Sequence, residues 1–595
     1  MITVTKIATL ALIVLGWGVS VGHAVEIASN GRASASIVVS GDASLSERHA
    51  ADELAHYLGQ VTGAEFTVGQ GAESVTGPRL LVGPGAARLA DPQFTVEGPG
   101  EEGLVIRTVG QDLILAGGRP RGTLYAVYAF LEDHVGVRWW APGVEFVPAR
   151  SELVFDNLNV RYVPRLEYRE PFWFSAFDGD WAARNRCNGA RPTLDEKRGG
   201  KHVIQGFVHT FYGLIPPNKY FADHPEWFSE IDGKRKHEQA QLCLTNDEVR
   251  TELIRNLAAQ LAKNPAATMA SVSQNDWYGN CQCAKCAAID KEEGSPAGSL
   301  LRFVNAVAEA IEKDYPRVAI STLAYQYTRK PPLKTRPRHN VVVWLCSIEC
   351  SFSKPLIDPR NEAFRKDIEG WSKVCNRLYV WDYTTNFAHY VMPHPNLNVL
   401  GPNVKFFADH GVVGLFEQGA YHTWGAEMME LRAWVLAKLL WDPSLDADKL
   451  IAEFIDGYYG PAAPHIRAYL KVTHDAVQAT GDPLGCFSGA DAKFLSLDTL
   501  SKGLAHLKAA EQAAGSDADL LLRVRTAQLP VLYTFIIQWG RLRKEAETTN
   551  APWPVAHTQI GVYREFLRTA EAIGMTRVAE GRDMAWLNTQ VDATE

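Results

Sequence analysis

Two stretches of sequence, residues 377–383 (RLYVWDY) and residues 412–418 (VVGLFEQ), decide the fold. Each is a short apolar run of the length of a buried strand. Six similar runs precede them, and amphipathic helical patterns such as Asp247–Lys263, Ser299–Asp314 and Asn361–Val374 separate several of the runs. Strands that alternate with helices indicate a parallel sheet, and eight repeats in about 250 residues predict a (β/α)8 TIM barrel of the α/β class.

The eight predicted strands are residues 165–174, 202–211, 239–245, 268–275, 319–327, 341–349, 377–383 and 412–418. The first two connections between these strands are only weakly helical, so the pattern is also compatible with a count that differs by one.

The predicted catalytic barrel, residues 160–425, lies between two further regions. Residues 25–150 predict a small α/β domain, with a helix over residues 47–58, a hairpin turn at Gly110–Gln111 and a second helix over residues 122–133. Residues 426–595 show helical patterns almost throughout. The N-terminal domain offers neither a nucleophile nor an acid/base pair, so we expect it to support the barrel or to bind sugar.

The first 24 residues have the pattern of a signal peptide. Lys6 precedes an apolar run over residues 7–16, and Gly22-His23-Ala24 is a small-x-small cleavage site. No other stretch approaches about 18 consecutive apolar residues, so we expect no transmembrane segment in the mature chain. The sequence therefore predicts export to the periplasm or beyond; a membrane-tethering helix is the alternative interpretation.

The composition disfavours nucleic acid as a partner. The formal net charge is −8 without a long basic run, whereas phosphate binding requires clustered Lys and Arg. The 16 Trp, 20 Tyr and 24 Phe are a high aromatic content, and loops rich in Trp are surfaces on which sugar rings stack. A glycan or glycoprotein is the expected partner.

The nine cysteines permit disulfides in an exported chain, and an odd number leaves at least one thiol unpaired. Cys281, Cys283 and Cys286 form a CxCxxC cluster, which is one ligand short of a closed zinc site. We interpret the cluster as structural, with disulfides shaping a loop, and expect neither a metal nor another cofactor. A metal site completed by a ligand from elsewhere in the chain is the alternative.

The carboxyl ends of the strands of such a barrel face the substrate, so these ends are where catalytic residues are expected. Acidic, amide, imidazole and aromatic side chains occur there, which is the set that a glycosidase uses to protonate a leaving oxygen and to stack on sugars. The predicted catalytic residues are Asp276, Asn275 and Glu417, and the predicted substrate-binding residues are His209, Trp277, Tyr325, Trp344, Glu349, Trp381 and Asp382.

The adjacent pair Asn275-Asp276, at the end of the fourth predicted strand, favours substrate-assisted cleavage. In that mechanism the 2-acetamido oxygen of the substrate attacks C1, one side chain orients the amide and the other protonates the leaving group. A turn that Asn and Asp stabilise is the structural alternative. Glu417 follows an apolar run, where burying a carboxylate is costly unless it has a partner or a function. A catalytic role and a structural ion pair are both compatible with this position.

Several motifs resemble those of a known family. They are the segments 209–211 (HTF), 224–228 (HPEWF), 241–246 (QLCLTN), 273–277 (SQNDW), 281–286 (CQCAKC) and 416–419 (FEQG). They resemble domain of unknown function 4838, whose members of known activity form glycoside hydrolase family 163, endo-β-N-acetylglucosaminidases acting on complex N-glycans. Residues 51–54 and 124–128 resemble the non-catalytic domain that precedes the barrel in α-glucuronidases and β-hexosaminidases.

The resemblance implies an exported N-acetylhexosaminidase in which Asp276 is the acid, Asn275 holds the acetamido group, and Glu417 and Asp382 assist. Related hexosaminidases usually place Glu where Asp276 stands, which leaves the acid open between Asp276 and Glu417. One rival is an α-glucuronidase-like inverting hydrolase with two separated carboxylates and basic side chains for a uronate. The other is a non-catalytic carbohydrate-binding protein.

Overall fold

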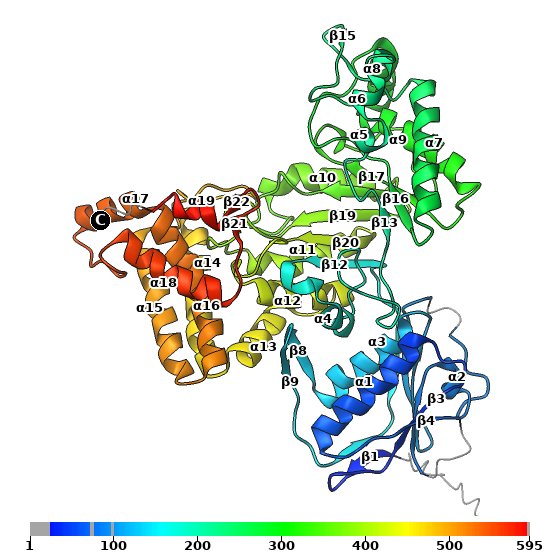
Figure 1. The fold of residues 1–595 in the computed structure, drawn as a ribbon, viewed down its shortest axis with the longest axis vertical. Coiled ribbons are helices and arrows are strands. Elements are labelled where there is room, and N and C mark those ends of the chain that lie inside the picture. The colour runs from blue at the N-terminus through cyan, green and yellow to red at the C-terminus, as the bar shows by residue number, and fades with distance from the viewer. Residues whose placement is uncertain (1–23, 72–76, 97–99, 592–595) are drawn as a thin grey trace, which may run out of the picture.

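The computed structural model describes residues 24–71, 77–96 and 100–591 (Figure 1). The predicted signal peptide lies outside the described residues except for Ala24. A central parallel sheet is joined to an N-terminal α/β region, drawn in blue, and to a helical C-terminal region, drawn in yellow, orange and red.

The N-terminal region is built on a six-stranded sheet flanked by helices. Helix α1 (Leu45–Thr62) begins at Ser44, whose hydroxyl accepts from the Glu47 amide while the Glu47 carboxylate accepts from the Ser44 amide. It ends at Gly63, which has a left-handed backbone. The strand order is β11 (Asn159–Tyr162), β6 (Leu104–Val109), β7 (Asp112–Gly117), β5 (Arg79–Val82), β3 (Ser36–Val39) and β4 (Val68–Gln70).

The predicted hairpin is present, because β6 and β7 pair antiparallel around Gly110. The second helix continues further than its regular part, α3 (Gly122–Ala129), through a π-helical turn over Phe130–Val135. Strand β11 extends the N-terminal sheet to residue 162, a few residues beyond the predicted start of the barrel region.

The central sheet contains seven parallel strands within the described part of the chain. Their order is β12 (Tyr168–Phe172), β20 (Val412–Gln418), β19 (Leu378–Tyr383), β18 (Val341–Cys346), β17 (Ala319–Ala324), β16 (Met269–Ser271) and β13 (Ile204–Gln205). Each strand lies within one of the predicted strand stretches.

The structure differs from the predicted eight-stranded ring at two places. Residues 239–245 form no strand of this sheet; Leu242 makes only an isolated antiparallel bridge with Phe228. The backbone N–H of Gln241 donates to the Gly279 carbonyl, so this segment pairs with a neighbouring loop instead of the sheet. Strands β12 and β13, which would close a ring, are the two ends of the strand order. The sheet is therefore a curled half-barrel, compatible with a TIM-like barrel.

Aromatic side chains fill the concave side of the sheet and show that it curls. The Tyr168 ring on β12 lies 5.2 Å from the Trp344 ring on β18, although two strands separate β12 from β18 in the sheet. The Tyr379 ring on β19 completes this group, 5.6 Å from Tyr168 and 5.0 Å from Trp344. The two pairs that include Trp344 are edge-to-face, and these aromatic contacts stabilise the interior that the curled sheet encloses.

The C-terminal region is helical, as the sequence predicts. Its principal helices are α12 (Met429–Trp441), α13 (Ala447–Tyr459), α14 (Ala463–Thr480), α15 (Leu497–Ala514), α16 (Ala518–Ile537), α17 (Trp539–Thr549) and α18 (Gln559–Ala572). Among the described residues, α16 alone is long and apolar enough to span a membrane, and 67% of its apolar window is buried within the protein.

A buried ion cluster connects the three regions. Glu132, from the N-terminal region, pairs with Arg186, which follows α4 (Gly179–Arg184), and with Lys438 of α12. Burial raises the pKa of Glu132, but the charges of Arg186 and Lys438 outweigh this effect and hold the pKa at about 2. Glu132 is therefore the ion-pair partner of both cations.

We expect Glu132→Gln to lower the free energy of unfolding by about 3–5 kcal/mol, because it removes the ion-pair partner of two buried cations. Since the folded pKa is below the usual 4.5, the stabilisation is present above pH 4.5 and is lost as pH falls towards 2. Thermal melts at pH 7 and pH 3 measure both effects. Glu152→Gln, at an exposed site of the same region, is the control. Equal melting temperatures for the two variants at pH 7 would contradict the prediction.

Candidate active site

A cavity of about 410 Å³ opens at the carboxyl ends of the central strands. Its wall is mostly aromatic, and it contains two carboxylates, Asp276 and Glu580. The other lining residues are Phe172, Phe207, Val208, His209, Leu323, Tyr325, Cys346, Ile348, Trp381, Tyr383, Phe387, Phe416, Gln418, Tyr421 and Phe487. This site matches the place where a barrel binds its substrate.

Alternation along the strands decides which side chains reach the cavity. Trp381 is aligned with Phe416 and Tyr383 with Gln418 in the parallel register of β19 and β20, and all four line the cavity. Trp381 Nε1 donates to Gln418 Oε1 over 2.7 Å, which fixes the indole in the wall. The residue between each such pair of positions points to the opposite face of the sheet.

Asp276 stands at the rim, in the loop that follows β16. Its side chain is 60% exposed, and its Oδ1 accepts a hydrogen bond of 3.0 Å from the Tyr325 hydroxyl. Burial, and then the negative charge of Asp276, raise the pKa of Tyr325, so the phenol stays protonated and remains the donor. A carboxylate that is held in place and open to solvent is suited to exchange a proton with a bound ligand.

His209 lies beside this pair on the same wall. Its Nδ1 is 2.8 Å from the Gln274 carbonyl oxygen, and this contact directs Nε2 towards Asp276 Oδ1, 3.9 Å away. His209 and Phe207 have positive φ angles of 56° and 48°. Non-glycine residues in this region carry strain of roughly 1–3 kcal/mol each, and such strain occurs most often at functional sites.

Asn275, the neighbour of Asp276, does not line the cavity. Its side chain is buried, its Oδ1 accepts from the Tyr212 amide over 3.2 Å, and its Nδ2 donates to the Ala240 carbonyl over 3.1 Å. The indole of Trp277 also donates to the Ala240 carbonyl, over 2.8 Å. Asn275 and Trp277 thus hold the loop that carries Asp276, and the side-chain hydrogen bonds of Asn275 are used within the protein.

Asp382 and Glu417 are aligned on adjacent strands, on the face of the sheet opposite the cavity. Both are buried, and the Ser347 hydroxyl donates to Asp382. Burial raises the pKa of Asp382 to about 6. Burial, and then the charge of Asp382, raise the pKa of Glu417 well above its usual value, which favours the protonated form of this buried carboxyl.

Two further predicted residues also lie outside the cavity lining. Trp344 is buried on the concave side of the sheet, in the group of rings that includes Tyr379. Glu349 is 41% exposed and forms an ion pair of 3.2 Å with Arg329. Of the ten residues predicted for the site, the cavity brings together Asp276, His209, Tyr325 and Trp381.

Glu580 was not predicted from the sequence. It follows β21 (Arg577–Ala579) near the C-terminus, its amide donates to the Phe387 carbonyl, and its carboxylate accepts from the Tyr421 hydroxyl over 2.7 Å. No local signal marks Glu580, since it follows the predicted barrel by more than 150 positions. By contrast, Tyr383 follows Trp381 by two positions and Gln418 follows Phe416 by two positions. Residues two apart in a strand share a face, so the sequence could have predicted both.

The cysteines differ from the expected disulfide arrangement. All nine are free thiols, and Cys243 joins Cys281, Cys283 and Cys286 in one buried cluster. Cys243 lies far from the CxCxxC motif in the chain, so the motif does not indicate it.

The family model for a domain of unknown function, DUF4838, matches residues 139–471, which is more than half of the chain. The chain belongs to this family. No curated protein matches it.

Solved structures of glycoside hydrolases resemble this DUF4838 chain. The structure of a family GH115 4-O-methyl-α-glucuronidase, BtGH115A, with specificity for decorated arabinogalactans, has a TM-score of 0.56 and 12% identity, and the match covers 96% of this chain and 79% of that chain. The structure of CpGH84B has a TM-score of 0.47 and 11% identity, with 95% and 97% covered. A GH138 enzyme targeting pectin rhamnogalacturonan II has a TM-score of 0.42 and 12% identity, with 91% and 92% covered. At these identities the likeness shows the fold alone.

The raised pKa of Glu417 has a measurable consequence. A carboxyl whose pKa is raised on folding contributes stability that is present below its usual pKa of 4.5 and is lost as pH rises through the folded pKa. In this pH range the free energy of unfolding should fall by roughly 1.4 kcal/mol per pH unit. We expect Glu417→Gln to remove this fall, because the Gln side chain stays neutral.

Melting temperatures at pH 5 and pH 8 test this expectation. The melting temperature of Glu417→Gln, relative to that of the unsubstituted protein, should be higher at pH 8 than at pH 5. Glu238→Gln, at a side chain 76% exposed, should show no such pH dependence. A difference that is the same at both pH values would mean that Glu417 is ionised in the folded protein.

Proposed function

We propose that the chain is a glycoside hydrolase that cleaves glycans containing N-acetylhexosamine, of the β-N-acetylglucosaminidase type, with Asp276 as the general acid. The observation that supports this most is the Asp276 carboxylate, held by Tyr325 at the rim of a cavity with an aromatic wall. An acid must reach the glycosidic oxygen, and aromatic faces bind the apolar faces of sugars.

The lining of the cavity supports an uncharged sugar over a uronate. Among the described residues, no Arg or Lys lines it, whereas recognition of a uronate carboxylate calls for a cation. Trp381, Tyr383 and Phe416 instead offer apolar surface that suits a sugar face or an acetamido methyl group. The resemblance of the motifs to glycoside hydrolase family 163 supports the same choice.

In the proposed mechanism the acetamido oxygen of the substrate attacks C1 while Asp276 gives its proton to the glycosidic oxygen, and the bond between C1 and that oxygen breaks. Glu580 accepts a hydrogen bond from the acetamido N–H, which makes the amide oxygen more nucleophilic. Water then opens the cyclised intermediate, and Asp276 takes back a proton. Asn275 contributes by holding the loop of Asp276, because its own polar atoms are bonded to the backbone.

Glu580 also supports a second candidate, an inverting hydrolase without participation of the substrate amide. In that reaction Asp276 protonates the leaving oxygen and Glu580 activates a water on the opposite face of the sugar, which requires carboxyl groups about 6.5–9.5 Å apart. Both candidate mechanisms use the same two carboxylates. They differ in whether the substrate's acetamido group takes part in the reaction. We further propose that the enzyme is exported, on the pattern of residues 1–24.

We expect the purified protein to release products from N-glycoproteins or from aryl N-acetyl-β-glucosaminides, and not from aryl α-glucuronides. Asp276→Asn should keep the fold and lower hydrolysis by at least about 100-fold, the scale of a lost general acid. Mass spectrometry of the products and initial rates across a panel of aryl glycosides measure both effects.

Asp232→Asn is the matched control, because Asp232 is exposed in a turn and its left-handed backbone tolerates Asn. It should keep full activity. Near-normal hydrolysis of a substrate with a poor leaving group by Asp276→Asn would exclude Asp276 as the acid. Glycan binding without hydrolysis of any substrate would favour a carbohydrate-binding protein.

If the acetamido group is the nucleophile, a thiazoline mimic of the cyclised intermediate should bind at least about 100-fold more tightly than N-acetylglucosamine, since binding is tuned to the reacting state. Glu580→Gln should reduce this preference, because the amide is then less well held. Inhibition constants for the two ligands measure it. Equal affinity for both would contradict participation and favour the inverting candidate.

A further inference from the structure

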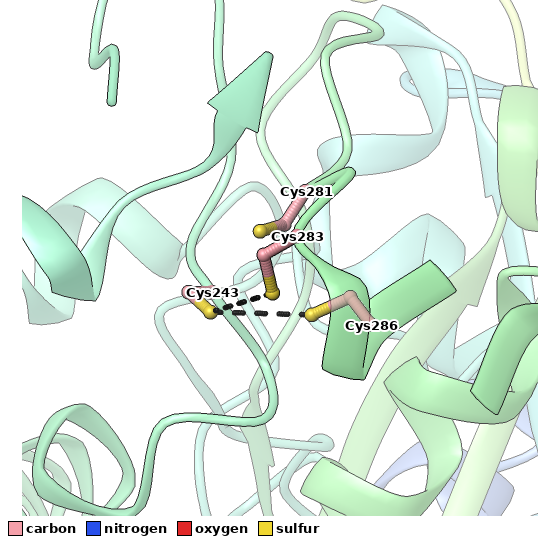
Figure 2. Close-up of side chains that lie close together, drawn as sticks. All are labelled: Cys243, Cys281, Cys283 and Cys286. Carbon is pink, nitrogen blue, oxygen red and sulfur yellow. Dashed lines mark hydrogen bonds between the residues drawn. The ribbon is translucent and has the colours of Figure 1, made fainter. Parts of the chain in front are cut away.

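Four cysteines from two separate segments meet outside the cavity, as Figure 2 shows. Cys281, Cys283 and Cys286 lie around the start of α8 (Ala284–Glu293), and Cys243 approaches them from a preceding loop. All four sulfur atoms lie within 4.8 Å of one another, with Cys243 Sγ 3.8 Å from Cys283 Sγ and 3.9 Å from Cys286 Sγ. All four residues are buried.

These distances fit four thiolates around one metal ion. Zinc–sulfur bonds of about 2.3 Å in a tetrahedron place neighbouring sulfurs about 3.8 Å apart. A disulfide would bring two sulfurs to about 2.05 Å, which none of these pairs approaches. A tetrahedral set of four sulfur ligands favours zinc among the common divalent metals. We propose that Cys243, Cys281, Cys283 and Cys286 bind one zinc ion.

Groups around the cluster are suited to support thiolates. The Glu230 amide donates to Cys281 Sγ over 3.3 Å, and the guanidinium of Arg235 lies 3.7 Å from the same sulfur. The Thr245 hydroxyl is 3.2 Å from Cys286 Sγ. Four thiolates exceed the charge of one Zn²⁺ by two, and donors of this kind offset the excess and orient the ligands.

The position of the cluster indicates a structural role. Four protein ligands leave no open coordination position for a substrate. The cysteines form a buried cluster of their own, apart from the main hydrophobic core, in the segment drawn green in Figure 1 that projects beyond the central sheet. A metal here would join the loop of Cys243 to the start of α8, in addition to the apolar contacts that Phe228 and Leu242 make in the main core.

The same ion connects the two segments that position Asp276. Gln241, two residues before Cys243, donates from Nε2 to the carbonyls of Asn275 and Trp277, and its Oε1 accepts from the Asn275 amide. Cys281 follows Asp276 by five positions. Binding Cys243 and Cys281 to one ion therefore fixes both sides of the loop that carries Asp276.

Elemental analysis of the full chain, purified under reducing conditions without added metal, tests the site. We expect about one zinc per chain, released when a mercurial reagent titrates the thiols. Cys243→Ser and Cys286→Ser should each lower the zinc content at least fivefold. Cys375→Ser, at a half-buried thiol outside the cluster, is the matched control and should keep one zinc.

A second measurement uses the unsubstituted protein, so its result does not depend on whether a cysteine variant folds. Cobalt exchanged into the unsubstituted protein should give the intense visible bands of a tetrahedral thiolate site. A metal-free chain whose four thiols all react with an alkylating reagent, a chain with two disulfides among these cysteines, or a chain that holds iron in place of zinc would each overturn the proposal. Zinc content is measured without a glycan, so Asp276→Asn should retain the metal even if the proposed hydrolase activity is absent.

Discussion

The register of the parallel strands is the constraint on which the candidate site depends. Once Trp381 is aligned with Phe416, the pleat sends Trp381, Tyr383, Phe416 and Gln418 to the concave face of the sheet and sends Asp382 and Glu417 to the other face. The cavity wall is consequently aromatic, and its carboxylates come from loops: Asp276 from the end of β16 and Glu580 from the C-terminal region. The strands supply a rigid wall for binding, and the segments around them supply the groups able to exchange protons.

Buried charges hold the surrounding regions against this sheet. Glu132 joins the N-terminal region to Arg186 and to α12, and Glu102 performs a similar role with Arg121 and Arg169 of β12, at 2.5 and 2.6 Å. Burial raises the pKa of Glu102, yet the charges of Arg169 and Arg121 bring it to about 2. Directional contacts of this kind fix how the regions sit on one another, because each charge is tolerated in the interior only where its partner is present.

The sequence predicted the strands and most helices because their signals are local. The apolar runs that contain β16 to β20 and the period of α7 (Asp247–Lys263) are read within a few residues. Long-range features were less accessible. Residues 239–245 have the composition of a strand but bond to the loop at Gly279, and nothing near Cys281 in sequence indicates Cys243. The orientation of Asp382 and Glu417 follows from which face of the sheet is concave, and that is a property of the whole sheet.

The origin of Glu580 and Phe487 has a consequence for how members of this family are to be compared. The region shared across the family ends at residue 471, whereas these two side chains complete one wall of the cavity from beyond that point. Changes in the segments that carry Phe487 and Glu580 would therefore alter the shape and charge of the cavity, while the strands and Asp276 stay the same. A match to the family model over residues 139–471 therefore leaves part of the cavity lining unspecified.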